Sequence, residues 1–104
     1  NCVALAVRNE PIRCNLTPEG AMLLGHVPMI SYYTPGSQEL VAAVAAEGRS
    51  KAILMERHGA ITQGRSLEEA YNRMEELEFQ AQLQLIVGDA EDLPADEVEK
   101  LSRM

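Results

Sequence analysis

The chain contains few cysteines, no secretion signal and no long apolar run. Two cysteines are too few for a disulfide scaffold. No segment combines basic, apolar and small residues in the order of a secretory signal. The longest apolar stretch, residues 40–46, is far shorter than the roughly 20 residues that cross a bilayer. These absences exclude a disulfide-rich secreted domain and a membrane span, and they predict a cytoplasmic protein.

Basic side chains are also scarce. Lysine and arginine number 9 against 16 aspartate and glutamate residues, so the formal net charge is -7. This charge opposes docking on nucleic acid or on an anionic membrane, and we expect neither partner. Much of the acidity lies in the second half, where we interpret it as a solvated helix face and a tail.

The length of 104 residues allows one small domain at most, burying about 60 to 70% of its unfolded surface. The sequence begins at Asn1 without an initiator methionine and passes directly into the apolar residues 3–7. Our interpretation is that it starts inside an element and that an upstream part is missing. No linker is visible before Gly88, so we predict one unit over residues 1–88 and an acidic helical tail over residues 89–104.

Three segments have the composition of strands. Residues 27–33 favour an edge strand because they include Pro28. Residues 52–55 form a short apolar run that is typical of a strand buried on both faces. The chain then reverses around residues 57–59 and returns as residues 60–62. Helices flanking such a strand pair predict an α/β fold, a three-layer sandwich with a mixed, largely antiparallel central sheet that needs further strands from elsewhere.

Helical patterns surround these strands. Residues 2–8 are expected to end a helix, and residues 17–24 are ambiguous. A turn at residues 34–37, with Pro35 suited to the first helical position and Ser37 or Thr34 as the cap, begins a helix to about Glu47 that Gly48 ends in a left-handed conformation. We expect this helix to pack on the sheet through Leu40, Val41, Val44 and Ala45.

The longest helix begins at a capping box, Ser66 to Glu69, and ends at Gly88. Its predicted apolar stripe is Leu67, Ala70, Tyr71, Met74, Leu77, Ala81 and Leu85. A last short helix is expected from about Ala95 to Arg103.

Few residues suggest chemistry. No phosphate-binding loop, dinucleotide fingerprint, paired-cysteine motif, hydrolase triad or zinc-protease motif is present. His58 follows a buried strand at a sharp turn, a position that suits a metal ligand or an acid/base, although a histidine filling a turn is the more frequent case. One imidazole makes no zinc site, because catalytic zinc takes about three protein ligands.

The other candidates have plainer explanations. Residues 35–37 could hold a phosphate at a helix start, but an ordinary N-cap is the more frequent case. We interpret His26 as exposed. The remaining polar candidates near strand ends are expected at the surface, and the cysteines are expected to be buried. These residues are Tyr32, Glu56 and Arg57, and Cys2 and Cys14.

An ordered set of short motifs nevertheless resembles a known family. It consists of Val27-Pro28, Tyr32, Pro35-Gly36-Ser37, Glu39-Leu40, residues 52–59 ending in Glu56-Arg57-His58-Gly59, residues 64–70, Glu75, Leu77-Glu78 and Ala81. This set is similar to the C-terminal half of the class II aldolase/adducin family, which includes fuculose-phosphate aldolases, ribulose-phosphate 4-epimerases and methylthioribulose-phosphate dehydratases. The resemblance extends to about Gly88.

The resemblance implies a function and a cofactor. It places His58 as the third histidine ligand of a catalytic Zn2+, with a His-x-His pair, absent here, just ahead of the segment that resembles residues 1–8. The family's phosphate loops and acid/base glutamate are also absent. In such enzymes zinc holds the oxygens of a ketose phosphate, such as fuculose 1-phosphate, and stabilises the enediolate that forms as a carbon-carbon bond breaks or joins. The resemblance further implies a homotetramer.

Three interpretations stay open. The first is a zinc-dependent aldolase, a lyase of carbohydrate metabolism represented here by a fragment. The second is a non-catalytic, adducin-like assembly module. The third is a sister epimerase or dehydratase acting on a pentulose phosphate. In each case we expect these 104 residues alone to bind zinc poorly and to be inactive.

Overall fold

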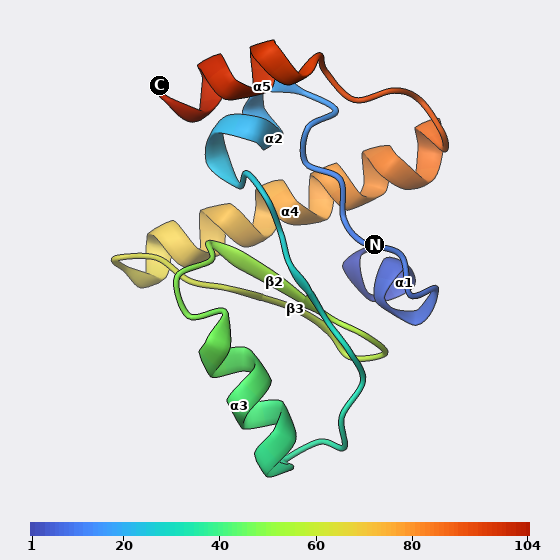
Figure 1. Cartoon of the computed structure of the whole chain (residues 1–104), viewed down its shortest axis with the longest axis vertical. Helices are drawn as coiled ribbons and strands as arrows, with labels where there is room; N and C mark the ends of the chain where they lie inside the picture. Colours follow the sequence, from blue (N-terminus) through green and yellow to red (C-terminus); the bar gives the residue numbers. More distant parts are fainter.

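The computed structural model describes all residues from 1 to 104. It contains five helices and three strands (Figure 1), which follow the chain in the order α1 (Cys2–Val7), α2 (Pro18–Leu23), β1 (Met29–Ile30), α3 (Gln38–Ala46), β2 (Ala52–Met55), β3 (Gly59–Thr62), α4 (Leu67–Val87) and α5 (Ala95–Ser102). The predicted α/β class and the three strand positions are confirmed.

The sheet is mixed, with β2 at its centre. β1 runs parallel to β2, with Met29 opposite Leu54, and β3 runs antiparallel to β2, with Ala52 opposite Thr62. The edge position of β1 agrees with the prediction from Pro28, whose carbonyl accepts the Leu54 N–H at 2.9 Å. β1 is shorter than predicted because only two of its residues pair with β2.

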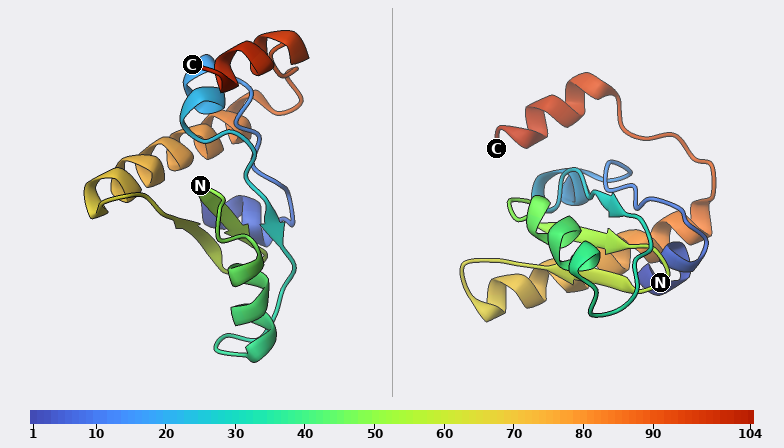
Figure 2. Two further views of the ribbon diagram at one scale, coloured as in Figure 1. Left: turned by 60° about the vertical axis from the view of Figure 1, so that its left-hand side comes forward. Right: turned by 60° about the horizontal axis from the view of Figure 1, so that its bottom comes forward.

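The hydrophobic core lies between the sheet and the helices α1 and α4. Both helices contact β2 and β3, while α2 packs on α4 and α5 packs on α2. Figure 1 shows α5, α2 and α4 following one another from the top of the view toward the hairpin, with α1 to the right. Figure 2 shows the same elements from two further sides. The core combines side chains from both ends of the sequence and includes Leu5, Leu54, Leu77 and Ala81, which have no exposed surface.

Helix α3 departs from the prediction that it packs on the sheet. It has no buried residue, and Val41 is 61% exposed. Figure 1 shows α3 projecting away from the other helices. Of the predicted apolar face, Leu40 and Val44 are half-buried while Val41 and Ala45 are exposed, so the other elements cover this face only in part.

The ends of α3 agree with the prediction at Ser37 but not at Pro35 or Gly48. Ser37 is the N-cap, and its hydroxyl accepts the Leu40 N–H at 3.2 Å. Pro35 lies before the helix, in a turn in which Gly36 has a φ of 78°. Gly48 does not take the left-handed conformation, because the helix ends in tightened turns, with the Gly48 N–H bonded to the Ala45 carbonyl at 3.1 Å.

The capping box of α4 is present in a shifted form. The Ser66 hydroxyl accepts the Glu69 N–H at 3.1 Å, but the Glu69 carboxylate accepts the N–H of Arg65, at 2.8 Å, rather than that of Ser66. Gly88 ends the helix at a φ of 62°, as predicted. Leu67 and Tyr71 are exposed, contrary to the predicted stripe, because the first turns of α4 extend past the strands (Figure 1).

Two glutamines take the buried positions on α4 that the apolar pattern did not identify. The amide of Gln84 donates to the Glu10 carboxylate and the Pro11 carbonyl, and its oxygen accepts the Arg13 N–H at 2.8 Å. The amide of Gln80 donates to the Thr17 hydroxyl at 3.0 Å. The bonds to Pro11 and Arg13 satisfy backbone groups of the extended segment that connects α1 to α2, and those to Glu10 and Thr17 hold its side chains.

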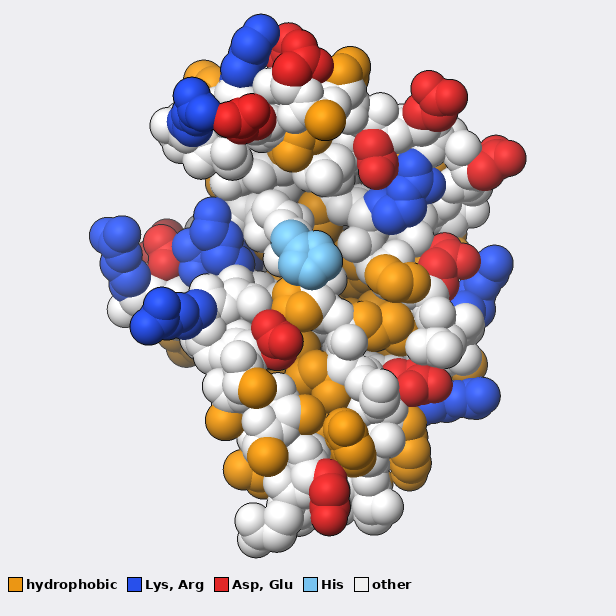
Figure 3. All heavy atoms as spheres, viewed as in Figure 1, with side chains coloured by type: hydrophobic (Ala, Val, Ile, Leu, Met, Phe, Trp, Pro, Cys, Tyr) orange, Lys and Arg blue, Asp and Glu red, His pale blue; other side chains and the backbone are white.

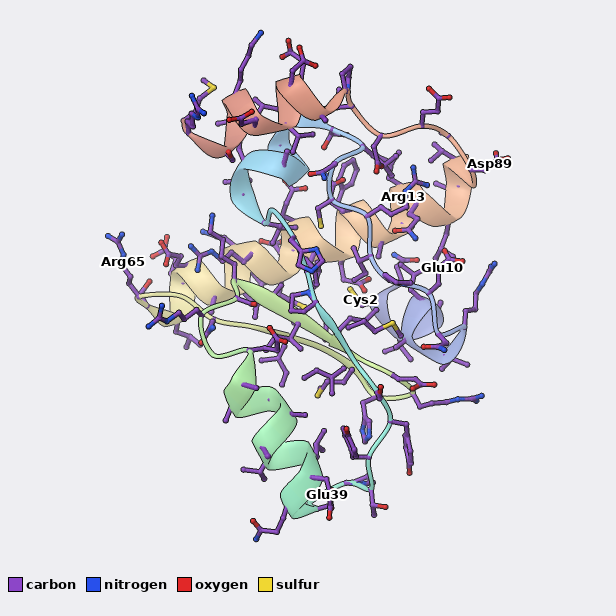
Figure 4. All side chains as sticks on the ribbon, viewed as in Figure 1. Cys2, Glu10, Arg13, Glu39, Arg65 and Asp89 are labelled. Carbon is purple, nitrogen blue, oxygen red and sulfur yellow. The ribbon has the colours of Figure 1, made fainter.

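The segment after α4 folds back over the body. The guanidinium of Arg13 donates to the carbonyls of Gly88 and Ala90 and forms an ion pair with Asp92 at 3.0 Å. Figure 4 shows Arg13 beside the end of α4 that leads into this segment. The last helix, α5, was predicted correctly, and none of the helices combines the length and apolarity that a membrane span requires.

Candidate metal site

The candidate ligand His58 lies on the corner between β2 and β3. The corner is tight because Arg57 has a φ of 68°, Gly59 has a φ of 147°, and the His58 N–H bonds to the Met55 carbonyl at 3.0 Å. Only glycine adopts the Gly59 conformation readily. The Arg57 N–H bonds to the Ala6 carbonyl at 3.0 Å, so the corner is fixed against α1.

The His58 ring is oriented by the segment that follows β1. Its Nε2 atom lies 3.1 Å from the carbonyl oxygen of Tyr33, and the ring stacks on Tyr32 with 5.5 Å between centroids and 14° between planes. With the proton on Nε2, this atom donates to the carbonyl and Nδ1 keeps a free lone pair. A ring nitrogen bonded to a backbone carbonyl is the usual arrangement of a metal-binding histidine, whose other nitrogen faces the metal.

Glu56 holds the same segment in place. Its carboxylate accepts the backbone N–H of Tyr32 at 2.9 Å, which occupies one of its oxygens. The structure thus brings together Tyr32, Glu56 and His58, three residues that the sequence singled out separately. It also adds the Tyr33 carbonyl, which no sequence pattern indicated, because the contact depends on the parallel pairing of β1 with β2.

The donor set around His58 fits a metal site in part. No group of three histidine, cysteine, aspartate or glutamate side chains in the 104 residues is arranged so that it could hold a metal ion. The other histidine, His26, is exposed in a loop, as expected. Burial raises the pKa of the Cys2 and Cys14 thiols to about 12, which makes them poor ligands and nucleophiles. These residues therefore supply one oriented imidazole, and a metal would need ligands from outside them.

The described residues do not enclose a substrate at His58. The four main hollows have volumes of about 370 to 580 Å³, and His58 lines none of them. The turn at residues 35–37 offers no second site either, since Ser37 acts as the ordinary N-cap of α3. Any pocket at the His58 corner would need walls from further protein.

Comparison with known proteins adds independent support for the family resemblance. The family model described as "Class II Aldolase and Adducin N-terminal domain" matches residues 1–85. A 3-oxo-tetronate 4-phosphate decarboxylase from Escherichia coli is 41% identical over 92 residues, which cover 86% of this chain and 42% of that protein. An L-fuculose phosphate aldolase from Methanococcus maripaludis is 32% identical over 88 residues, which cover 85% of this chain and 48% of that protein.

Solved structures agree in fold. The crystal structure of YgbL from Escherichia coli, a candidate aldolase, epimerase or decarboxylase, matches with a TM-score of 0.88 and 34% identity. The match covers 97% of this chain and 52% of YgbL. The chain thus spans about half the length of the relatives it matches.

Proposed function

Because the chain belongs to the class II aldolase and adducin family, we propose that the full-length protein is a metal-dependent lyase that breaks a carbon-carbon bond in a phosphorylated carbonyl compound. His58 is the residue of this chain that binds the metal, which we propose to be Zn2+. The observation that carries the proposal is the orientation of its ring by the Tyr33 carbonyl and the Tyr32 ring, which leaves Nδ1 free.

The further ligands come from outside these 104 residues, since one imidazole cannot hold a catalytic zinc. A divalent metal supplies Lewis-acid stabilisation of negative charge on a substrate oxygen. The chain's own residues orient the His58 ring and hold the corner that carries it. The Tyr33 carbonyl accepts a hydrogen bond from Nε2–H of His58, and the Tyr32 ring limits rotation of the imidazole. The hydrogen bond from the Arg57 N–H to the Ala6 carbonyl fixes the corner against α1.

The substrate class follows from a chemistry that the named relatives share. Decarboxylation of a 3-oxo acid and aldol cleavage both break a bond to the carbon next to a carbonyl, so that the electron pair moves onto the carbonyl oxygen. We favour a 3-oxo-tetronate 4-phosphate as substrate, because relatives with that name are 41% and 43% identical to this chain. Aldol cleavage of fuculose 1-phosphate is the second candidate, supported by relatives at 32% and 38% identity.

We also propose that the protein works in the cytoplasm as a homotetramer. The exposed part of the α3 apolar face, including Val41, and the open surroundings of His58 support this assembly, since further protein would cover both. Residues 1–88 then form one half of the catalytic domain, and residues 89–104 form the helical tail.

The experiment is a comparison of two substrates on the full-length protein. We expect kcat/KM for carbon dioxide release from 3-oxo-tetronate 4-phosphate to be higher than kcat/KM for aldol cleavage of fuculose 1-phosphate. The His58→Ala variant should lose at least about 100-fold, since even outer-shell partners of metal ligands cost about 10 to 100-fold when removed. The proposal fails if neither compound is cleaved, or if the His58 variant keeps full activity.

A further inference from the structure

A hollow of about 370 Å³ lies at the end of the hairpin opposite His58. It has no hydrophobic lining and is formed by the loops on either side of the hairpin and by the first turns of α4. His58 lies at the closed corner, whereas Lys51 and Gln63 mark the open end, where the Gln63 N–H bonds to the Lys51 carbonyl at 3.1 Å. Four-residue strands separate the two ends by roughly 13 Å.

Positive charge is concentrated in this hollow. Its lining includes four of the chain's nine basic residues but only one of its sixteen carboxylates. The basic residues are Arg49, Lys51, Arg65 and Arg73, and the carboxylate is Glu69. Figure 3 shows blue side chains gathered on the left of the molecule, and Figure 4 places Arg65 at this edge. The local net charge of +3 contrasts with the -7 of the whole chain.

The hollow has a hydrogen-bonded frame. The amide of Gln63 donates to the carbonyls of Gly48 and Ser50, which fixes the loop carrying Arg49 and Lys51. Arg73 donates to the Gln63 carbonyl at 2.6 Å and pairs with Glu69 at 3.5 Å.

Three cations remain without a partner. Arg49, Lys51 and Arg65 form no ion pair within 4.0 Å and donate no side-chain hydrogen bond. Like charges held together without counter-charge repel one another, and a bound anion relieves this repulsion. Glu69 compensates this charge only in part, because one carboxylate faces four cations and pairs directly only with Arg73, while Arg65 and Lys51 act on it from beyond ion-pair distance.

From this arrangement we propose that the hollow binds the phosphate groups of a small anionic molecule, at a site separate from the His58 corner. Guanidinium groups bind phosphate through paired hydrogen bonds, and a lysine adds a point charge. Three unpaired cations match a phosphate or diphosphate better than a singly charged carboxylate. The acidity of the remaining chain opposes a long polyanion such as nucleic acid.

The test is a titration of the full-length protein with inorganic pyrophosphate at low salt, followed by backbone amide NMR. We expect the backbone amide signals of Arg49, Lys51 and Arg65 to shift and to saturate. Pyrophosphate bound only at the His58 corner would not produce these shifts. The pocket variant carries Arg49→Gln, Lys51→Gln and Arg65→Gln, all exposed side chains. In this variant the dissociation constant for pyrophosphate, measured from the amide shifts at positions 49, 51 and 65, should rise at least about tenfold, because three charge-assisted contacts are lost.

The matched control carries Arg8→Gln, Lys100→Gln and Arg103→Gln, which removes the same charge from exposed positions elsewhere. It should change the dissociation constant by no more than about twofold, since distant exposed charges are screened. The inference is overturned if the wild-type shifts do not saturate, if they occur only elsewhere in the protein, or if the control weakens binding as much as the pocket variant.

Discussion

At the residue scale, single polar contacts decide what the side chains of this chain can do. His58 is held by one carbonyl and one aromatic ring, and Gln84 uses both ends of its amide to hold the segment after α1. Glu78 is likewise governed by a polar contact, since its carboxylate accepts a hydrogen bond from the Cys2 N–H at 2.6 Å. That bond is the main reason why the pKa of Glu78 is lower than its usual 4.5.

Glu78 should therefore stabilise the fold in a pH-dependent way. Its folded pKa is lowered, so the stabilisation is present above pH 4.5 and is lost as the pH falls through the folded pKa. We expect Glu78→Gln to lower the free energy of unfolding at pH 7 by a measurable amount of up to about 1 kcal/mol, since the carboxylate is partly exposed. The difference from wild type should shrink below pH 4.5 in urea unfolding.

The control for this prediction is Glu75→Gln, on an exposed part of the same helix. It should leave the free energy of unfolding unchanged at pH 7. A Glu78 variant as stable as wild type at pH 7 would remove the Cys2 hydrogen bond from the account.

At the element scale, α2 and α4 approach each other through a glycine. A Cβ atom at Gly20 would lie 2.8 Å from Cδ of Gln80, which is fully buried. It would also collide with the backbone carbonyl of Cys14. The Thr17 hydroxyl accepts both the Gly20 N–H, at 3.1 Å, and the Gln80 amide, so the contact is hydrogen-bonded as well as close.

Gly20→Ala should consequently destabilise the protein by about 1 to 3 kcal/mol, the usual cost of overpacking a close contact. Thermal or urea unfolding of the full-length protein measures it. Gly48→Ala is the matched control, since its Cβ would meet only the Ala45 carbonyl, at 3.2 Å and at an exposed helix end. It should change stability by less than about 0.5 kcal/mol. Equal effects of the two variants would contradict the close approach of α2 to α4.

The sequence predicted the elements better than their surroundings. The β2 and β3 strands, the Ser66 cap and the Gly88 stop follow local rules and were found. The exposure of Leu67 and the burial of Gln80 were not predictable from periodicity, because they depend on which parts of α4 other elements reach. The same reason explains α3, whose predicted apolar face is covered only in part.

At the scale of the whole molecule, the chain spans about half the length of the relatives it matches. His58 and its position after a buried strand were predictable, and the resemblance gave it a role as a metal ligand, which stays a prediction. The partners that orient the ring, Tyr32 and Tyr33, lie 26 and 25 residues earlier in the sequence, and only the pairing of β1 with β2 brings them to it. No three candidate ligands are arranged to hold a metal ion within the 104 residues, so the proposed site needs ligands from outside them.

The central claim is that His58 binds the metal, and metal content tests it most directly. The measurement is mass-spectrometric metal analysis of the full-length protein as purified, for wild type, His58→Ala and the control His26→Ala, whose side chain is exposed in a loop. We predict about one zinc per subunit in wild type and in the His26 variant, and almost none in the His58 variant. Undiminished zinc in the His58 variant, or a wild-type protein without any divalent metal, would contradict the account.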